Sequence, residues 1–137
     1  GNGWKGRYKG TYFRSVRELT MMVMLDREGI TWRAAEDIEI DYLTPMGKLG
    51  TYRPDFLVEG TRLVEVKPRR LWATPTVVAK KAGAEEFCKQ NGLTYELVDP
   101  TLLDPTDFAA MRRAGDLVFE KRYEDKFLAK YGDLALS

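Results

Sequence analysis

The sequence contains no histidine, and this absence removes several classes of active site. The chain cannot form a Ser-His-Asp or Cys-His nucleophile, and it cannot hold zinc through imidazole. Its one cysteine, Cys88, cannot form an internal disulfide or a cysteine-rich zinc site, which fits a reducing compartment. Catalysis would therefore depend on carboxylates, lysine, arginine, hydroxyl groups or a metal ion held by oxygen ligands.

Long apolar runs and a strong bias of charge are also missing. No apolar run reaches the roughly 18 residues that a membrane span needs, and no signal peptide is recognisable. We therefore expect a cytoplasmic protein without membrane contact. The 22 basic and 21 acidic residues leave a net charge of +1, which alone argues neither for nor against nucleic-acid binding. The 137 residues, 44% of them hydrophobic, suffice for one domain with a real core.

The order of sequence patterns predicts an α/β (α+β) fold with a mixed central sheet flanked by helices. Ser15 and Glu18 form a capping-box pattern that opens a helix, and Gly29 ends it. Further elements follow from periodicity and turn residues. They are strands at 37–43, 52–58, 61–67 and 93–98, a helix at 77–90, and helices after Pro100. We interpret the chain as one domain with three parts: a basic, aromatic arm (1–14), a catalytic core (15–99) and a C-terminal helical extension (100–137).

The candidate active site lies on two neighbouring strands. Pro54-Asp55 precedes an apolar strand, Glu59-Gly60 makes a tight turn, and Glu65-Val66-Lys67 lies in the next strand. Glu65 and Lys67 are two residues apart and face the same side, and the turn can bring Asp55 across from Glu65. Two carboxylates suit a hard cation such as Mg²⁺, and a lysine beside them can assist an attacking water. The alternative is an ordinary hairpin whose charged side chains are solvated.

Basic residues surround this motif. Arg69 and Arg70 follow the Glu-Val-Lys strand directly, and Lys80 and Lys81 lie in the next helix. A positive stripe beside an acidic metal site is what a phosphate backbone requires. We take these residues as candidates for DNA contact, together with Arg14 and Arg17 near the N-terminus; the alternative is a solvated loop and helix start.

These motifs resemble the PD-(D/E)XK nuclease superfamily, with Pro54-Asp55 and Glu65-Val66-Lys67 as the two halves of its signature. The resemblance implies a restriction-endonuclease-like core. It also implies that Asp55 and Glu65 bind the metal and that Lys67 is catalytic. An acidic residue of the preceding helix often completes such a site, and Glu18 occupies that position. Its capping-box position also gives Glu18 a purely structural explanation.

Residues 12–100 further resemble phage nucleases of the T4-type head-completion group. They resemble, more loosely, transposon end-cleaving subunits and phage junction-resolving endonuclease I. We therefore expect a Mg²⁺-dependent DNA endonuclease, with Mn²⁺ as a substitute, acting on DNA ends or structures.

The rival interpretations are a four-way-junction resolvase, a transposon end-cleaving nuclease, and a virion structural protein that binds DNA ends. A homodimer, phage capsid or tail partners and association with the virion belong to these expectations.

Overall fold

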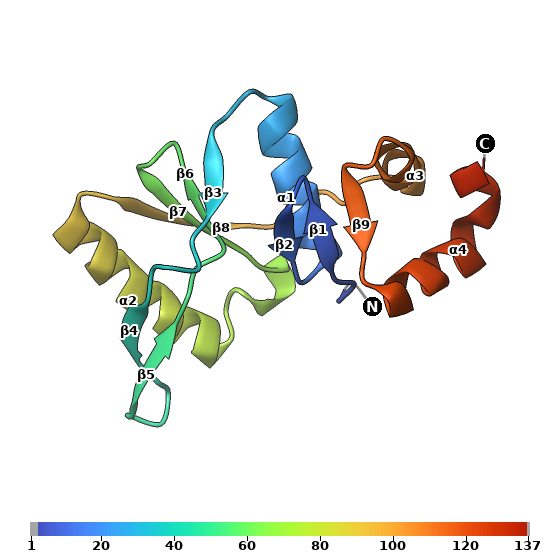
Figure 1. Ribbon diagram of the computed structural model, residues 1–137. Coiled ribbons are helices and arrows are strands. Elements are labelled where there is room, and N and C mark those ends of the chain that lie inside the picture. Colours follow the sequence, from blue (N-terminus) through green and yellow to red (C-terminus); the bar gives the residue numbers. More distant parts are fainter. Residues whose placement is uncertain (1–2, 137) are drawn as a thin grey trace. The chain divides into compact units, whose positions relative to one another are not determined.

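The computed structural model describes residues 3–136. The chain forms two compact units (Figure 1). One unit combines the residues up to Val23 with those from Pro100 onward. The other runs from Met24 to Asp99 and contains the signature residues. In the described part of the chain, no helix combines the length and the apolar character needed to cross a membrane.

The second unit is built on a four-stranded mixed sheet in the order β3-β6-β7-β8. Its strands are β3 (Trp32–Ala34), β6 (Phe56–Val58), β7 (Arg62–Val66) and β8 (Thr94–Val98). The first three are antiparallel neighbours, and β8 runs parallel to β7. The turn between β6 and β7 places Glu59 and Gly60 at positive φ, 55° and 68°, as a tight hairpin of this type requires. The expected mixed sheet is therefore confirmed.

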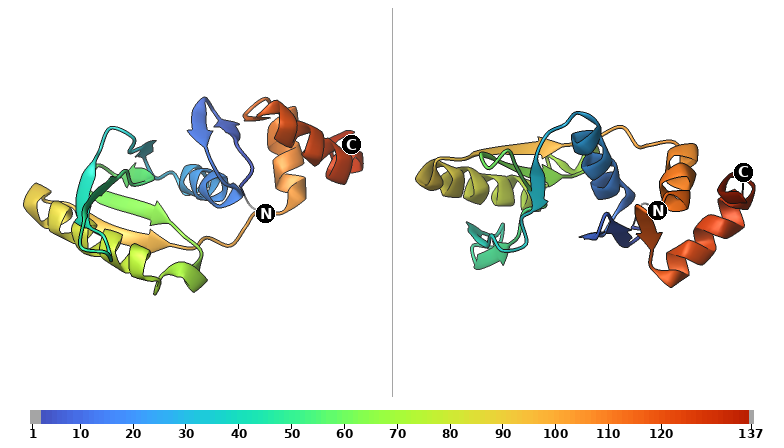
Figure 2. Two further views of the ribbon diagram at one scale, coloured as in Figure 1. Left: turned by 90° about the horizontal axis from the view of Figure 1, so that it is seen from below. Right: turned by 45° about the horizontal axis from the view of Figure 1, so that its top comes forward.

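Helix α2 (Pro75–Asn91) makes the crossover between β7 and β8 and runs along one face of the sheet (Figure 2). It has proline at its N-terminal end, where a missing N–H costs nothing. It ends at Gly92, whose φ of 67° lets its N–H bind the Cys88 carbonyl. Ala84 and Cys88, four residues apart, are buried against the sheet, so Cys88 is a core residue.

The segment before β6 differs from the sequence expectation of one strand at 52–58. The chain forms a separate hairpin of β4 (Ile40–Leu43) and β5 (Leu49–Tyr52), and the expected strand at 37–43 begins only at Ile40. Arg53 to Asp55 then lead into β6, in the other sheet. Pro54 has no N–H to donate to a ladder, which explains why pairing stops between the two strands.

The first unit contains a three-stranded sheet, β2-β1-β9, with helices α3 (Pro105–Arg113) and α4 (Lys121–Leu136). Helix α1 (Val16–Arg27) begins in this unit. The segment expected as an arm is a hairpin of β1 (Gly6–Tyr8) and β2 (Thr11–Phe13). Its Tyr8 and Phe13 are buried, so these aromatic side chains pack within the protein.

The region after Pro100 was expected to be helical with a break near Gly115, and the structure has a strand beside that break. Strand β9 (Leu117–Phe119) lies between α3 and α4 and pairs with β1. Three residues are too short to produce a visible alternation, and the partner strand lies more than a hundred positions away in sequence. The pairing also explains Gly6, because a Cβ there would lie 2.4 Å from the carbonyl oxygen of Val118.

Candidate active site

Asp55 and Glu65 lie together at the start of the β6–β7 hairpin. The register pairs Phe56 with Val64, so the preceding residue, Asp55, stands opposite Glu65. The two carboxyl groups are close enough for the charge of Glu65 to act on Asp55. Glu65 is only 8% exposed, which rules out the alternative of a solvated hairpin face at this position.

The electrostatics of this pair are unfavourable without a compensating charge. Burial, and then the charge of Glu65, raise the pKa of Asp55 well above its ordinary range. A hydrogen bond of 2.7 Å from the backbone N–H of Val66 to Oδ2 of Asp55, and the charge of Lys67, act in the opposite direction. A partly buried carboxyl group beside a buried one is stabilised by a shared proton or a cation, and carboxylate oxygen atoms are the ligands that hard divalent cations prefer.

Lys67 follows the last residue of β7, and both its backbone N–H and its carbonyl form hydrogen bonds. Its N–H donates to the Val98 carbonyl at 2.9 Å, which continues the parallel ladder beyond the strand. Its carbonyl accepts a hydrogen bond of 2.8 Å from the indole N–H of Trp72. Because strand residues alternate, Lys67 faces the same side as Glu65. The structure thus brings Asp55, Glu65 and Lys67 together.

A short 3-10 helix, η1 (Arg69–Leu71), carries the next two basic residues. The backbone N–H of Arg69 donates to Oδ2 of Asp99 at 2.8 Å, which ties η1 to the end of β8. The Arg69 guanidinium lies 4.4 Å from the centre of the Trp72 ring. Arg69 and Arg70 are both exposed. Trp72 therefore helps to hold a fixed pair of exposed arginines two residues beyond Lys67.

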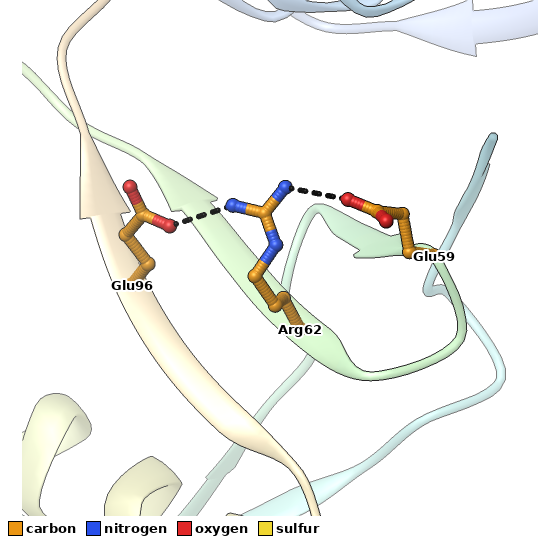
Figure 3. A network of polar contacts seen from close by, with 3 residues as sticks. All are labelled: Glu59, Arg62 and Glu96. Carbon is orange, nitrogen blue, oxygen red and sulfur yellow. Dashed lines mark hydrogen bonds and ion pairs between the residues drawn. The ribbon is translucent and has the colours of Figure 1, made fainter. Parts of the chain in front are cut away.

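The other basic residues of this region have different surroundings. Lys80 lies over the rings of Tyr52 and Tyr42, at 5.4 and 5.9 Å, whereas Lys81 is exposed. Arg62 is engaged by two carboxylates, Glu96 at 3.1 Å and Glu59 at 3.2 Å (Figure 3). Arg62 thus joins the β6–β7 turn to β8, and it is not part of a surface that offers positive charge to DNA.

Sequence reasoning missed two tyrosines next to the carboxylates. Tyr95 is the register partner of Leu63 on β7, and Tyr52 packs in the same cluster. Burial raises the pKa of both phenols, and the charge of Glu65 acts in the same direction. The hydroxyl of Tyr52 is buried and makes no hydrogen bond of regular geometry. Only the pairing of β7 with β8 reveals this neighbourhood, and no local sequence signal carries it.

Glu18 lies in the first unit and makes the Ser15 half of the expected capping box, while its carboxylate bonds the residue before Ser15. Its N–H donates to Oγ of Ser15 at 3.1 Å, and its Oε2 accepts from the backbone N–H of Arg14 at 2.9 Å. The Arg14 guanidinium lies 5.1 Å from the Tyr12 ring, and Arg17 is partly buried. The site described above therefore consists of residues of the second unit.

Among the residues that the structure describes, no group of three or more histidine, cysteine, aspartate or glutamate side chains is arranged to hold a metal ion. The acidic ligands gathered at the site are the pair Asp55 and Glu65. Water and phosphate oxygens would complete the coordination of a cation there, which is usual for Mg²⁺.

Residues 26–99 match the family model described as TnsA-like endonuclease N terminal. The chain belongs to the TnsA-like endonuclease family. No curated protein and no solved structure matches the chain. The match covers the sheet, α2 and all three signature residues, and it supports the nuclease superfamily and a restriction-endonuclease-like α+β fold. The resemblance to phage head-completion nucleases stays a prediction.

Proposed function

We propose that this protein is a divalent-cation-dependent endonuclease that hydrolyses phosphodiester bonds of DNA. The observation that carries the proposal is the pair of carboxyl groups opposite each other, Asp55 and buried Glu65, with Lys67 facing the same side as Glu65. Membership of an endonuclease family supports it. The exposed arginines of η1 lie where a phosphate backbone would need positive charge.

Each residue of the site has a role that follows from its position. Asp55 and Glu65 would hold the cation, and the Val66 N–H keeps the Asp55 carboxylate oriented toward Glu65. A divalent cation bound there supplies positive charge for the scissile phosphate and lowers the pKa of water. Lys67 positions the attacking water or stabilises the charge that develops on phosphate. The water oxygen bonds to phosphorus, one ester P–O bond breaks, and the leaving oxygen takes up a proton.

Glu18 stays a proposed catalytic residue. This role rests on the position of Glu18 in the first helix, which is where the superfamily often carries an acidic residue. The hydrogen bonds of Glu18 also satisfy a structural role. The substitution Glu18→Gln separates the two roles, because it removes the charge and keeps an oxygen that can accept a hydrogen bond.

Among the possible substrates, the family match favours a transposon end over a four-way junction or a packaged phage end. Nothing in the site reads base edges, so the chain alone should cut with low sequence specificity. Resolution of a junction needs two active sites, and a stable homodimer would favour that substrate. The head-completion role, with capsid or tail partners, would instead require binding to those proteins.

The test is a nicking assay on supercoiled plasmid, linear ends and a four-way junction. Mg²⁺ and Mn²⁺ should support cleavage, and Ca²⁺ should bind without supporting it well. EDTA should abolish cleavage, and added Mg²⁺ should restore it. Cleavage that continues unchanged in EDTA would remove the cation from the mechanism.

A further inference from the structure

The β4–β5 hairpin carries an apolar tip that the proposed chemistry does not use. Leu43, Met46 and Leu49 are 64%, 85% and 76% exposed. Leu43 and Leu49 stand directly opposite each other in the ladder, and Met46 lies in the turn between them. Figure 1 shows the tip extending away from the four-stranded sheet. Exposed apolar side chains gathered in this way indicate a surface that meets another molecule.

The base of this hairpin is fixed to the body of the second unit. Ile40 and Tyr52 are register partners and are both buried. Helix α2 approaches the hairpin so closely that a Cβ on Gly83 would lie 2.6 Å from Cβ of Tyr42. The rings of Tyr42 and Tyr52 meet edge to face at 5.8 Å. The base of the hairpin is therefore packed against the second unit, while its tip projects into solvent.

The tip is also preformed. The N–H of Thr44 donates to the Lys48 carbonyl at 2.8 Å, and the N–H of Gly47 donates to the Thr44 carbonyl at 2.9 Å. The side chain of Thr44 accepts a third hydrogen bond, from the N–H of Lys48 at 3.0 Å. Gly47 takes a φ of 79°, which a residue with a side chain rarely adopts. The three apolar side chains therefore sit on a closed turn that needs no ordering when it binds.

The hairpin leads directly into the active site. Strand β5 ends at Tyr52, and Asp55 lies three residues further along the chain. Lys80 of α2 lies against the rings at the hairpin base, and exposed Lys48 lies beside the tip. The acidic residues Asp37 and Glu39 at the approach to β4 form ion pairs with Arg33 and Arg53, which reduces their repulsion of phosphate.

We propose that Leu43, Met46 and Leu49 form a wedge that enters duplex DNA and unstacks base pairs beside the phosphate to be cut. This inference rests on the proposed nuclease function. Three side chains are far fewer than the roughly 20–30 residues a side of a stable protein interface. They match the small apolar wedges that DNA-bending proteins insert between base steps.

The experiment compares a paired duplex with the same duplex carrying a short unpaired bubble. The double variant Met46→Ser, Leu49→Ser should nick the paired duplex about tenfold or more slowly, because it no longer offsets the cost of unstacking. On the bubble it should cut within about twofold of the wild-type rate, since the DNA is already open. The control is Val78→Ser, which alters another exposed apolar side chain, on α2, and should leave both rates unchanged.

A second measurement does not depend on cleavage. Duplexes carrying 2-aminopurine at successive positions are mixed with protein in Ca²⁺. Fluorescence should rise with the wild-type chain and Val78→Ser, and it should stay flat with the double variant. A thermal melt should show equal stability, because the replaced side chains are exposed.

The outcomes separate this inference from the nuclease proposal. If the wild-type chain cuts DNA and the double variant cuts the paired duplex equally fast, the wedge alone is overturned. Equal losses on paired and bubble DNA would also overturn the wedge. A fall from dimer to monomer in the double variant would show that the tip joins two copies of the chain. If the wild-type chain cuts neither substrate, both proposals fail together.

Discussion

Asp55 and Glu65, the proposed ligands of a cation, show a cost that folding must tolerate. Glu65 is buried and Asp55, opposite it, is partly buried, and the pKa of Asp55 is raised by burial and by the charge of Glu65. At neutral pH and without a cation, the native state therefore carries a penalty that the unfolded chain does not. The same arrangement would supply the ligands of the proposed cation, so function and stability should respond in opposite directions to one substitution.

Asp55→Asn should raise the melting temperature in EDTA at neutral pH by about 2–6 °C, the shift expected for roughly 1 kcal/mol in a domain of this size. Asparagine can still accept the Val66 N–H bond and no longer repels Glu65. The gain should shrink as the pH falls, because protonation of Asp55 in the native protein removes the same repulsion. Added Mg²⁺ should stabilise the wild-type chain more than the variant.

The control for this melt is Asp41→Asn, which removes an exposed carboxylate outside the site. It should leave the melting temperature within about 1 °C, as is usual for surface substitutions. A lower melting temperature for Asp55→Asn in EDTA would show that the two carboxyl groups are not in conflict.

Glu18→Gln distinguishes a capping residue from a residue of the site. Glutamine retains an oxygen that can accept the Arg14 N–H, and the Ser15 half of the capping box is untouched. The melting temperature should therefore hardly move. We expect the nicking rate to fall by about 10²-fold or more, because the proposed supporting charge is lost. Wild-type nicking with an unchanged melt would leave Glu18 as a helix cap only.

At the scale of elements, local sequence patterns predicted helix ends and tight turns, which depend on neighbouring residues. The helix now seen as α2, its glycine end and the β6–β7 turn follow from proline, glycine and periodicity, and the Ser15 half of the capping box of α1 is present. The hairpin of β1 and β2, strand β9 and the separation of β5 from β6 were missed. These strands have three or four residues each, and pairing with distant partners stabilises them more than any local pattern.

Helix η1 gives a prediction about DNA binding. Replacing Arg69 and Arg70 together with alanine should weaken binding to DNA of any sequence. It should also reduce the slope of log K against log salt by about 2. The fold should tolerate the change, because both side chains are exposed and the Arg69 contact with Asp99 is made by the backbone. Titrations at several salt concentrations measure both quantities.

The matched control removes two other exposed charges of the same unit, Arg27 and Lys89. Replacing them with alanine keeps the net charge equal to that of the first variant. An equal loss of affinity in both variants would mean that DNA responds only to total charge, and η1 would then have no special role.

At the scale of the whole molecule, the signature alone predicted which three residues gather, because Lys67 directly follows the strand that holds Glu65, and Asp55 lies across a tight turn. The neighbours of that group could not be predicted. Tyr95 reaches it through the parallel pairing of β8 with β7, and Asp99 holds η1 from the end of β8. Both depend on the α2 crossover, which brings together segments about thirty residues apart.

The most direct test of the account is the nicking of supercoiled plasmid in Mg²⁺ by Lys67→Ala, with the DNA affinity of each protein measured in parallel. The nicking rate should fall by about 10²–10⁴-fold, the range that a positioned acid or base contributes. Affinity should change by less than about threefold, because Lys67 is one of several basic residues of the site. Lys89→Ala, at an exposed position, should match the wild-type chain in both. A Lys67→Ala protein that nicks at the wild-type rate would contradict the account.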